Sequence, residues 1–276
     1  MTYPNLPMMM SPAISVAIFN AISKEYGVEF RLFETTQYAD EVVNRHIKMA
    51  SYGANRGNQK DERDEEYFLV KPKTQIIPDF LEVVNEYEPD VILMSMQEDV
   101  YTIGTELLES IRNKNIPHII GGVFPSQAPD VVMKNELIRC IAVHEGENTY
   151  RQLIESWKET GSFYNIDGIW WKDENNVIHK NKPASLCNIA QIIPDFSCYE
   201  NKRWQRPMGG KHFYRAVSME TYRGCPYKCT YCNSPSTREL SKKLDLGNYM
   251  RRKPFDIVER DLQYYIEHIG PDLIMF

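Results

Sequence analysis

The chain has 276 residues, of which 42% are hydrophobic and 25% are charged, and 32 Lys and Arg against 38 Asp and Glu give a formal net charge of −6. This length is that of one large domain or two modest ones, and the composition is ordinary for a soluble globular protein. No stretch is apolar for long enough to span a membrane, the N-terminus lacks the positive charge of a signal peptide, and no basic stripe is available to bind nucleic acid. We therefore expect a cytoplasmic protein that binds neither membranes nor nucleic acid.

Helical and strand-like patterns alternate through the first 160 residues. A helix is predicted from Pro12, after the N-cap residue Ser11, to Gly27, because apolar residues recur there at helical spacing. Further helices are predicted at 39–49, 78–87, 102–113, 129–135 and 149–157, strands at 28–32, 90–95, 117–122 and 138–143, and an exposed polar loop or frayed helix at 51–66. Strands that alternate with helices in this way are typical of a parallel, doubly wound sheet with right-handed crossovers.

The carboxyl ends of the strands are where such sheets bind their ligands. In this chain the predicted ends carry small and polar residues: Ser95, Gly121, Gly122, His144, Glu145, Gly146 and Glu147. Contact with a ligand and plain turn chemistry are both open for the glycines and the glutamates. His144 could face a ligand, and a solvated loop is the preferred interpretation.

The pattern changes after Gly161. Residues 168–172 and 176–180 are predicted to pair as a β-hairpin, and a Pro-containing connector over 181–210 leads to a strand at 214–221. A helix at 255–268 and a strand from residue 272 follow. We therefore expect three parts: residues 1–160 as a Rossmann-like domain, 161–210 as a hairpin and connector, and 211–276 as the beginning of a further domain.

Three of the six cysteines, Cys225, Cys229 and Cys232, lie close together after a predicted strand. Clustered thiols without a secretory signal indicate a metal site rather than disulfides. Three cysteines on one loop can hold a 4Fe-4S cluster and leave the fourth iron open to a substrate or cofactor. The alternative is a structural zinc site, which needs a fourth ligand and usually a second pair of cysteines. His212 lies upstream as a candidate for that fourth ligand.

The spacing of these cysteines, with Tyr231 before the last of them, resembles the motif of the radical S-adenosylmethionine (radical SAM) enzymes. The resemblance implies that Cys225, Cys229 and Cys232 ligate a 4Fe-4S cluster whose open iron chelates S-adenosylmethionine. It further implies reductive cleavage of S-adenosylmethionine to a 5′-deoxyadenosyl radical, with a reductant such as flavodoxin or ferredoxin as partner. Tyr231 would lie against the adenine, and the alternative for this residue is a place in the hydrophobic core. The substrate would be a small molecule or a peptide.

Four further stretches resemble the cobalamin-binding branch of the same family: Ile119–Val123, Glu145–Thr149, Ile193–Phe196 and Tyr249–Arg252. The resemblance implies cobalamin as a further cofactor of the N-terminal domain. Its contacts are then expected at the strand ends: Ser95, Gly121, Gly122, Glu145, Gly146 and Glu147. The loop Asn5–Ser11 stands where related domains carry a cobalt-ligating histidine, and it contains none. Cobalamin would therefore be bound without a histidine ligand, or not at all.

These patterns predict an α/β protein in which a Rossmann-like, cobalamin-binding-type domain precedes the start of a radical SAM (β/α) barrel over residues 211–276. The expected function is that of a radical SAM enzyme, with cobalamin-dependent methyl transfer or a related C–H functionalisation as the outcome. Residues 214–276 have room for one strand, one helix and the start of a second strand, so the sequence looks like the front part of a longer enzyme or an inactive fragment. Two other functions stay open: a non-catalytic corrinoid-binding or iron–sulfur accessory protein, and a structural zinc-knuckle module.

Overall fold

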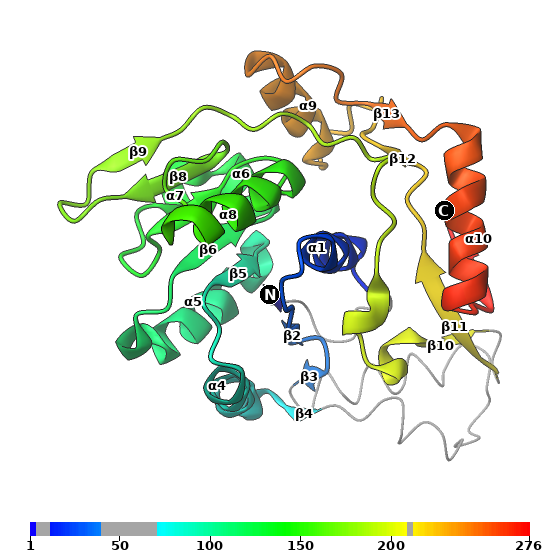
Figure 1. Cartoon of the computed structure of the whole chain (residues 1–276), viewed down its shortest axis with the longest axis horizontal. Coiled ribbons are helices and arrows are strands. Elements are labelled where there is room, and N and C mark those ends of the chain that lie inside the picture. The colour runs from blue at the N-terminus through cyan, green and yellow to red at the C-terminus, as the bar shows by residue number, and fades with distance from the viewer. Residues whose placement is uncertain (4–11, 40–70, 209–211) are drawn as a thin grey trace.

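A seven-stranded sheet forms the centre of the computed structural model, which describes residues 1–3, 12–39, 71–208 and 212–276 (Figure 1). In spatial order its strands are β2 (Phe33–Glu34), β1 (Thr2–Tyr3), β5 (Ile92–Ser95), β6 (His118–Gly121), β7 (Cys140–Ala142), β8 (Ile169–Lys172) and β9 (Ile178–Lys180). The strands β2, β1, β5, β6 and β7 run parallel to one another. The strand β8 pairs antiparallel with β7, and β9 pairs antiparallel with β8. The predicted α/β class with a mainly parallel sheet is confirmed.

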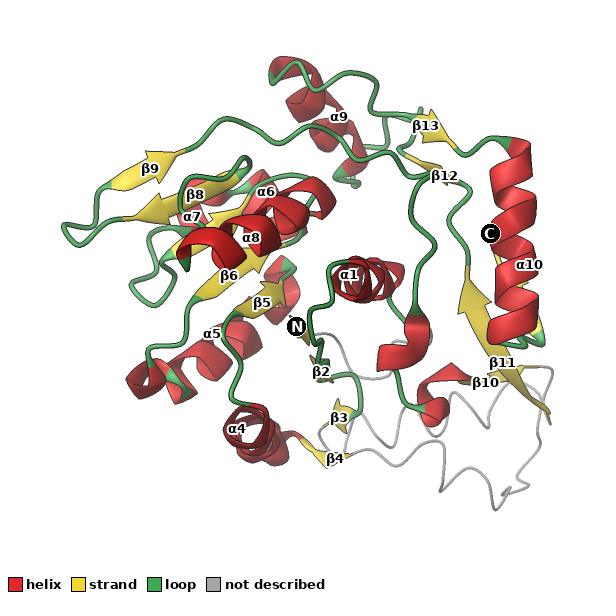
Figure 2. Ribbon diagram, viewed as in Figure 1, coloured by secondary structure: helices red, strands yellow, loops and turns green. Residues whose placement is uncertain are grey.

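Helices cover both faces of this sheet (Figure 2). They are α1 (Ile14–Glu25), α4 (Ile76–Tyr87), α5 (Tyr101–Ser110), α6 (Val123–Gln127), α7 (Pro129–Val132) and α8 (Glu147–Thr160). On one face Ile120 of β6 belongs to a core with Phe80 of α4 and Leu107 of α5. Its neighbour Ile119 belongs to a second core with Leu153 of α8 on the other face. Successive strand residues therefore bury their side chains on opposite sides, as a doubly covered parallel sheet requires.

The strand β1 is only two residues long, and it pairs with β2 on one side and with β5 on the other. The strand predicted at 28–32 is wrong: the structure places it at Phe33–Glu34, because a ladder forms only opposite a partner strand and Thr2 faces Phe33. A short parallel ribbon pairs β3 (Tyr38–Ala39) with β4 (Lys71–Pro72). The predictions for the loop at 5–11, for most of the helix at 39–49 and for the polar stretch at 51–66 lie outside the described residues.

The order of the strands reverses between β1 and β5. In open α/β sheets, ligands bind beside such a reversal, in the crevice outside the carboxyl ends of the strands. The predicted hairpin is confirmed as β8 and β9, and it extends the large sheet at the edge formed by β7. Among the described residues, we find no helix with the length and apolar character needed to cross a membrane.

A second, smaller sheet follows the connector. It has the order β10 (Gln205–Met208), β11 (His212–Ser218) and β14 (Leu273–Met275), with β10 antiparallel and β14 parallel to β11. The helix α10 (Phe255–His268) links the two parallel strands and packs on this sheet through Tyr265, in a core with Val217, Phe196 and Trp204. The chain from β11 through α10 to β14 is therefore a strand–helix–strand unit.

The helix α1 lies between the two sheets and contributes to the cores of both (Figure 1). Ile18 and Ile22 pack with the large sheet, whereas Val16 and Ala17 pack with the core around α10. The backbone N–H of Asp195 in the connector also donates to the carbonyl oxygen of Ala17 over 2.9 Å. The division of the chain at residues 160 and 210 stays a prediction.

The predicted cluster of cysteines lies on a long excursion between two short strands. The strand β12 (Tyr222–Arg223) pairs antiparallel with β13 (Arg251–Arg252), and the helix α9 (Ser234–Lys243) lies in the segment between them. We call this segment, residues 224–250, the cysteine loop. Its two ends are held side by side by the β12–β13 ribbon.

Candidate cofactor site

The cysteine loop begins at a glycine that the local geometry requires. Gly224 has φ +101°, and a Cβ atom there would lie 2.8 Å from the carbonyl oxygen of Tyr249 and 3.0 Å from Cα of Met250. Both the positive φ and the close approach of backbone exclude a larger residue without strain. Gly224 thus lets the two ends of the loop approach each other.

The three thiols of the loop are free and accessible. Cys225 and Cys229 are half-buried and Cys232 is exposed. The N–H of Cys232 donates to the carbonyl oxygen of Cys229 over 3.2 Å, and the N–H of Ser234, at the start of α9, donates to Sγ of Cys232 over 3.4 Å. Backbone donors to cysteine sulfur are one of the means by which proteins tune iron–sulfur clusters.

The side chain of Arg238 on α9 fixes the first part of the cysteine loop. Its guanidinium Nη1 donates to the carbonyl oxygen of Pro226 over 3.0 Å and to that of Cys225 over 3.4 Å. The first and last cysteines of the motif are therefore both tied to the same helix. This restricts the loop before any cofactor binds.

Among the described residues, the ligand atoms that gather within 4.8 Å of one another belong to Glu145, Glu147 and Cys187, not to the cysteine loop. A single zinc ion needs all its ligands at bonding distance, whereas the ligands of a 4Fe-4S cluster bind separate irons. Whether the cysteine loop forms a 4Fe-4S site or a zinc site stays a prediction.

The two glutamates of that group are bound by arginines. We call Glu145–Glu147, between β7 and α8, the acidic turn. Nη1 of Arg223 donates to Oε1 of Glu147 over 2.6 Å, and Arg251 donates to both carboxylate oxygens of Glu145, over 2.9 Å to Oε2. Since two guanidinium groups already compensate the carboxylates, this group is an ion-pair cluster and not a free metal site.

Burial and hydrogen bonding set the protonation of this cluster. Burial alone would raise the pKa of Glu145, but the hydrogen bond from Arg251 and the charges of Arg223 and Arg251 hold it below its usual value. Cys187 lies beside it, with its backbone N–H donating to Oε2 of Glu145 over 3.0 Å. Burial, with the nearby charge of Glu147, raises the pKa of the Cys187 thiol to about 12. At neutral pH the carboxylate of Glu145 is therefore ionised, and the thiol of Cys187 beside it is protonated.

The arginines come from the two facing strands of the β12–β13 ribbon, where Arg223 is the register partner of Arg251. Like charges directly opposite each other destabilise a ribbon. Here each arginine has its own carboxylate in the acidic turn, and Arg223 also binds Glu220 over 2.8 Å and 3.0 Å. The base of the cysteine loop is thus fastened to the carboxyl edge of the large sheet.

Two further contacts dock α9 on the same edge. Gln127 of α6 donates from Nε2 to Oγ1 of Thr237 over 2.9 Å and accepts from Oγ of Ser236 over 2.8 Å. Nε2 of His144 is hydrogen-bonded to Oγ of Ser241 over 2.6 Å. The solvated loop expected for His144 is therefore wrong: this residue is half-buried against α9, since the cysteine loop covers the strand ends.

A cavity of about 460 Å³ lies beneath these contacts, and we call it the carboxyl-edge cavity. All six predicted cobalamin contacts line it: Ser95, Gly121, Gly122, Glu145, Gly146 and Glu147. Residues that the sequence did not single out also line it, among them Ser126, Gln127, Arg223 and Thr237. The structure therefore joins the ends of β5, β6 and β7 and the base of the cysteine loop in one site.

The floor of this cavity is apolar, because it extends between α1 and α8 to the face of the sheet. Ile18 and Phe19 line it from α1, and Leu153 lines it from α8. At two glycines in the wall of the cavity, neighbouring atoms leave no room for a side chain. A Cβ at Gly122 would lie 2.7 Å from the carbonyl oxygen of Met96, and one at Gly146 would lie 2.9 Å from the ring of Phe19.

Tyr231 lies apart from the carboxyl-edge cavity. Its side chain is 91% exposed, so it is not part of a hydrophobic core. The adenine contact predicted for it stays a prediction. The side chain of His212, the candidate zinc ligand, lies outside the described residues.

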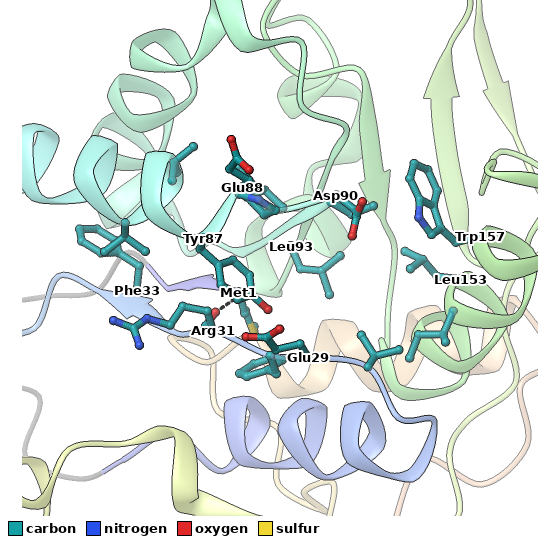
Figure 3. Close-up of a pocket in the computed structure, with 18 of the residues that line it drawn as sticks. Met1, Glu29, Arg31, Phe33, Tyr87, Glu88, Asp90, Leu93, Leu153 and Trp157 are labelled. Atoms are coloured by element: carbon teal, nitrogen blue, oxygen red, sulfur yellow. Dashed lines mark hydrogen bonds between the residues drawn. The ribbon is translucent and has the colours of Figure 1, made fainter.

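A second cavity, of about 410 Å³, lies at the opposite edge of the sheet, where the strands begin (Figure 3). Glu29, Arg31, Tyr87 and Asp90 surround it, with Leu153 and Trp157 of α8 on another side. None of the predicted site residues lines it. We therefore take the carboxyl-edge cavity as the candidate site.

Comparison with known proteins relates this fold to a class. The chain matches no protein-family model. Among curated proteins it is similar to an uncharacterised methyltransferase of Pyrococcus horikoshii, with 24% identity over 165 residues that make up 56% of this chain and 34% of that protein.

Among solved structures it is similar to the cobalamin-dependent S-adenosylmethionine radical enzyme OxsB with aqua-cobalamin bound, at a TM-score of 0.61 and 18% identity, covering 98% of this chain and 32% of OxsB. It is also similar to TsrM of Kitasatospora setae, a radical S-adenosylmethionine methyltransferase with cobalamin and a [4Fe-4S] cluster bound, at a TM-score of 0.58 and 14% identity. That match covers 96% of this chain and 45% of TsrM.

The chain therefore has a fold found in cobalamin-dependent radical SAM enzymes, and the resemblance stated from the cysteine motif is confirmed. It spans about a third of the methyltransferase and of OxsB, and less than half of TsrM.

Proposed function

We propose that this chain is part of a radical SAM iron–sulfur enzyme that uses cobalamin and S-adenosylmethionine to transfer a methyl group or to functionalise a C–H bond. One observation carries the proposal: partly buried ion pairs fasten the cysteine loop over the cavity that the six predicted cobalamin contacts line. A motif that matches by chance would not bring its loop to the ligand-binding edge of the other sheet. The methyltransferase among its relatives and the two radical enzymes among its structural neighbours support the same class.

Cys225, Cys229 and Cys232 are the proposed ligands of a 4Fe-4S cluster. Such a cluster supplies one electron to the sulfonium of S-adenosylmethionine held at its open iron, and a flavodoxin or ferredoxin is the proposed electron donor. The chain's own residues position the thiols: Gly224 closes the loop, Arg238 holds its first part, and the N–H of Ser234 donates to Cys232.

The carboxyl-edge cavity is the proposed cobalamin site. Its volume lies in the usual range for small-molecule pockets, and its apolar floor between α1 and α8 suits a flat, weakly polar part of the cofactor. Among the described residues that line the cavity, the one imidazole is that of His144, and its Nε2 is already bonded to Ser241. We therefore propose that these residues hold cobalamin without a histidine ligand to cobalt.

The unit from β11 through α10 to β14 is the proposed opening of a (β/α) barrel, and residues 1–160 the cobalamin-binding-type domain before it. Parallel strands linked by a helix are the repeating unit of such barrels. The substrate would be a small molecule or a peptide.

The test is the composition of anaerobically purified and reconstituted protein. We expect iron and sulfide to approach four each per chain, as a 4Fe-4S cluster requires. Replacement of all three loop cysteines by alanine should abolish both. Cys198→Ala, a half-buried cysteine outside the loop, is the matched control and should retain them. About one zinc and no sulfide would contradict the proposal and favour the zinc knuckle.

Hydroxocobalamin binding, followed by its absorption spectrum, tests the second cofactor. Cleavage of S-adenosylmethionine by the reduced, loaded protein separates an enzyme from an accessory protein. An accessory protein would bind both cofactors and leave S-adenosylmethionine intact.

A further inference from the structure

The acidic turn belongs to two structures at once. Glu145, Gly146 and Glu147 form part of the wall of the carboxyl-edge cavity. The two carboxylates of the same turn bind the arginines at the two ends of the cysteine loop. Whatever displaces the turn must therefore displace the base of the loop.

The arginines flank the loop on both sides. Arg223 directly precedes Gly224, and Arg251 directly follows the last residue of the loop. Because the two are register partners in the ribbon, one carboxylate of the turn faces the entry of the loop and the other faces its exit. Residues of the cysteine loop, Thr237 and Tyr249, also line the cavity, so a ligand there would touch both sides of the ion pairs.

The four side chains of these two ion pairs are largely shielded from solvent, so we expect the two pairs to form and break together. Glu147 is 8% exposed and Glu145 13%, while Arg223 and Arg251 are 20% and 17% exposed. Separating such a pair without a replacement partner leaves a buried charge uncompensated, so intermediate arrangements are disfavoured. Cys187 reinforces the unit, because its carbonyl oxygen accepts from Arg251 over 2.8 Å while its N–H donates to Glu145.

We infer that Arg223 and Arg251 are positioning residues that couple the two cofactor sites: a ligand in the carboxyl-edge cavity orders the cysteine loop, and a cluster on the loop tightens the cavity. The inference rests on the proposed function and adds to it a thermodynamic link between the sites. Such a link is reciprocal, because a change in one affinity must appear equally in the other.

The test measures the dissociation constant of hydroxocobalamin for protein with and without its iron–sulfur cluster. In the wild type we expect cluster loading to tighten cobalamin binding about fivefold or more, as is usual for coupled sites. In Arg251→Gln and Glu145→Gln the ratio of the two dissociation constants should fall to about one. If the salt bridge were purely structural, its loss would raise both dissociation constants by the same factor and leave their ratio unchanged.

Three further variants sharpen the test. Arg251→Lys cannot make the bidentate contact with the carboxylate of Glu145, so it should give a ratio of dissociation constants between that of the wild type and one. The exchange Glu145→Arg with Arg251→Glu should restore part of the coupling. Arg112→Gln, which removes an exposed ion pair with Glu109 far from the site, should keep the wild-type ratio. Circular dichroism of each cluster-free variant shows whether it is folded.

The possible failures are distinguishable. If the wild type binds the cluster and hydroxocobalamin, but the two hydroxocobalamin dissociation constants are equal, the coupling is overturned and the proposed function stands. A folded wild type that binds no hydroxocobalamin would overturn both. The rate at which a chelator removes iron, with and without hydroxocobalamin, is an independent readout and should fall on binding only while the arginines are intact.

Discussion

His144 and Ser241 are joined by a hydrogen bond of 2.6 Å between Nε2 and Oγ, although 97 positions separate them in the chain. The contact links the end of β7 to α9, and it places an imidazole where the cysteine loop meets the large sheet. His144 has φ +80°, a conformation that is uncommon for residues other than glycine and in which Asn, Asp and His are the most frequent exceptions.

The first prediction concerns the pH dependence of stability. Burial lowers the pKa of His144 below 6.5, with Arg251 acting in the same direction and Glu145 and Glu147 opposing it. The unfolded chain therefore takes up this proton at a higher pH than the folded chain does. Its contribution to stability is complete above about pH 6.5 and is lost as the pH falls toward the folded pKa.

Asparagine tolerates the positive φ at this position. When the pH is lowered from 7.5 to 5.5, we therefore expect the melting temperature of His144→Asn to fall less than that of the wild type. Thermal unfolding of the two proteins at both pH values measures this. An equal loss in both would contradict the assigned role of His144.

A second prediction concerns the glycine at the entry of the cysteine loop. Gly224→Ala introduces a methyl group 2.8 Å from the carbonyl oxygen of Tyr249 at a positive φ, so the loop must shift. We expect a cost of about 1–3 kcal/mol in local stability and a faster loss of iron from the reconstituted protein.

Gly247→Ala is the matched control, since Gly247 also has a positive φ in the same loop but no atom lies within 4 Å of its Cβ position. Iron release, followed with a chelator, should be faster in Gly224→Ala than in Gly247→Ala. Equal rates would mean that the close approach at Tyr249 is unimportant.

A third prediction distinguishes the two cavities of the sheet. Ala142 lines the carboxyl-edge cavity, and Val28 lines the cavity at the opposite edge. Ala142→Phe should weaken hydroxocobalamin binding about tenfold or more, because the ring fills space that the cofactor needs, a loss of about 1.4 kcal/mol. Val28→Phe should leave binding unchanged. The reverse pattern in a spectroscopic titration would place the cofactor at the other edge.

A fourth prediction concerns the most deeply buried ion pair among the described residues. Lys253 and Asp261 are 2% and 1% exposed, at 2.6 Å, and Asp261 also binds Arg260 over 2.6 Å. Asp261→Asn leaves the buried Lys253 charge without its carboxylate and should cost about 3–5 kcal/mol. Lys253→Met leaves Asp261 with Arg260 and should cost less. Denaturant unfolding gives both values, and a smaller loss for Asp261→Asn would refute the asymmetry.

Much of the site could be predicted from short-range patterns. The strand ends at Ser95 and Gly121–Gly122 follow apolar runs of strand length, and in a parallel sheet such ends must meet at one edge. That is why six residues from three separate loops line one cavity. The cysteine triad stands out through its spacing, its place after a strand and the neighbouring Tyr231, and its role as a cluster ligand stays a prediction.

The pairing of Arg223 with Glu147 and of Arg251 with Glu145 could not be predicted. The partners lie 76 and 106 positions apart, and no period or local motif connects them. From the sequence, the run Arg251–Lys253 is open to contact with a carboxylate or phosphate, although a solvated turn is the more usual interpretation of such a run. Arg251 binds Glu145, and Lys253 binds Asp261. The first of these contacts depends on the tertiary fold, which brings the acidic turn to the β12–β13 ribbon.

The strand at 28–32 shows a different limit. Its alternation of apolar and polar residues satisfies the pattern of a strand, but pairing decides where a ladder forms, and β1 faces only Phe33 and Glu34. Apolar–polar alternation is a property of one segment, whereas a β-strand also requires hydrogen bonds to a second segment.

The helix α1 has a consequence for dissecting the protein. Val16 and Ala17 are buried in one core and Ile18 and Ile22 in another. Residues 1–160 made alone would therefore leave Val16 and Ala17 open to water, and residues 161–276 made alone would lack the helix that covers the core around Val217 and Tyr265. Expression of residues 1–160 or 161–276 as separate pieces should therefore yield aggregates. Calorimetry of the intact chain should record one cooperative transition, because heat cannot melt either core without exposing the helix that the two share.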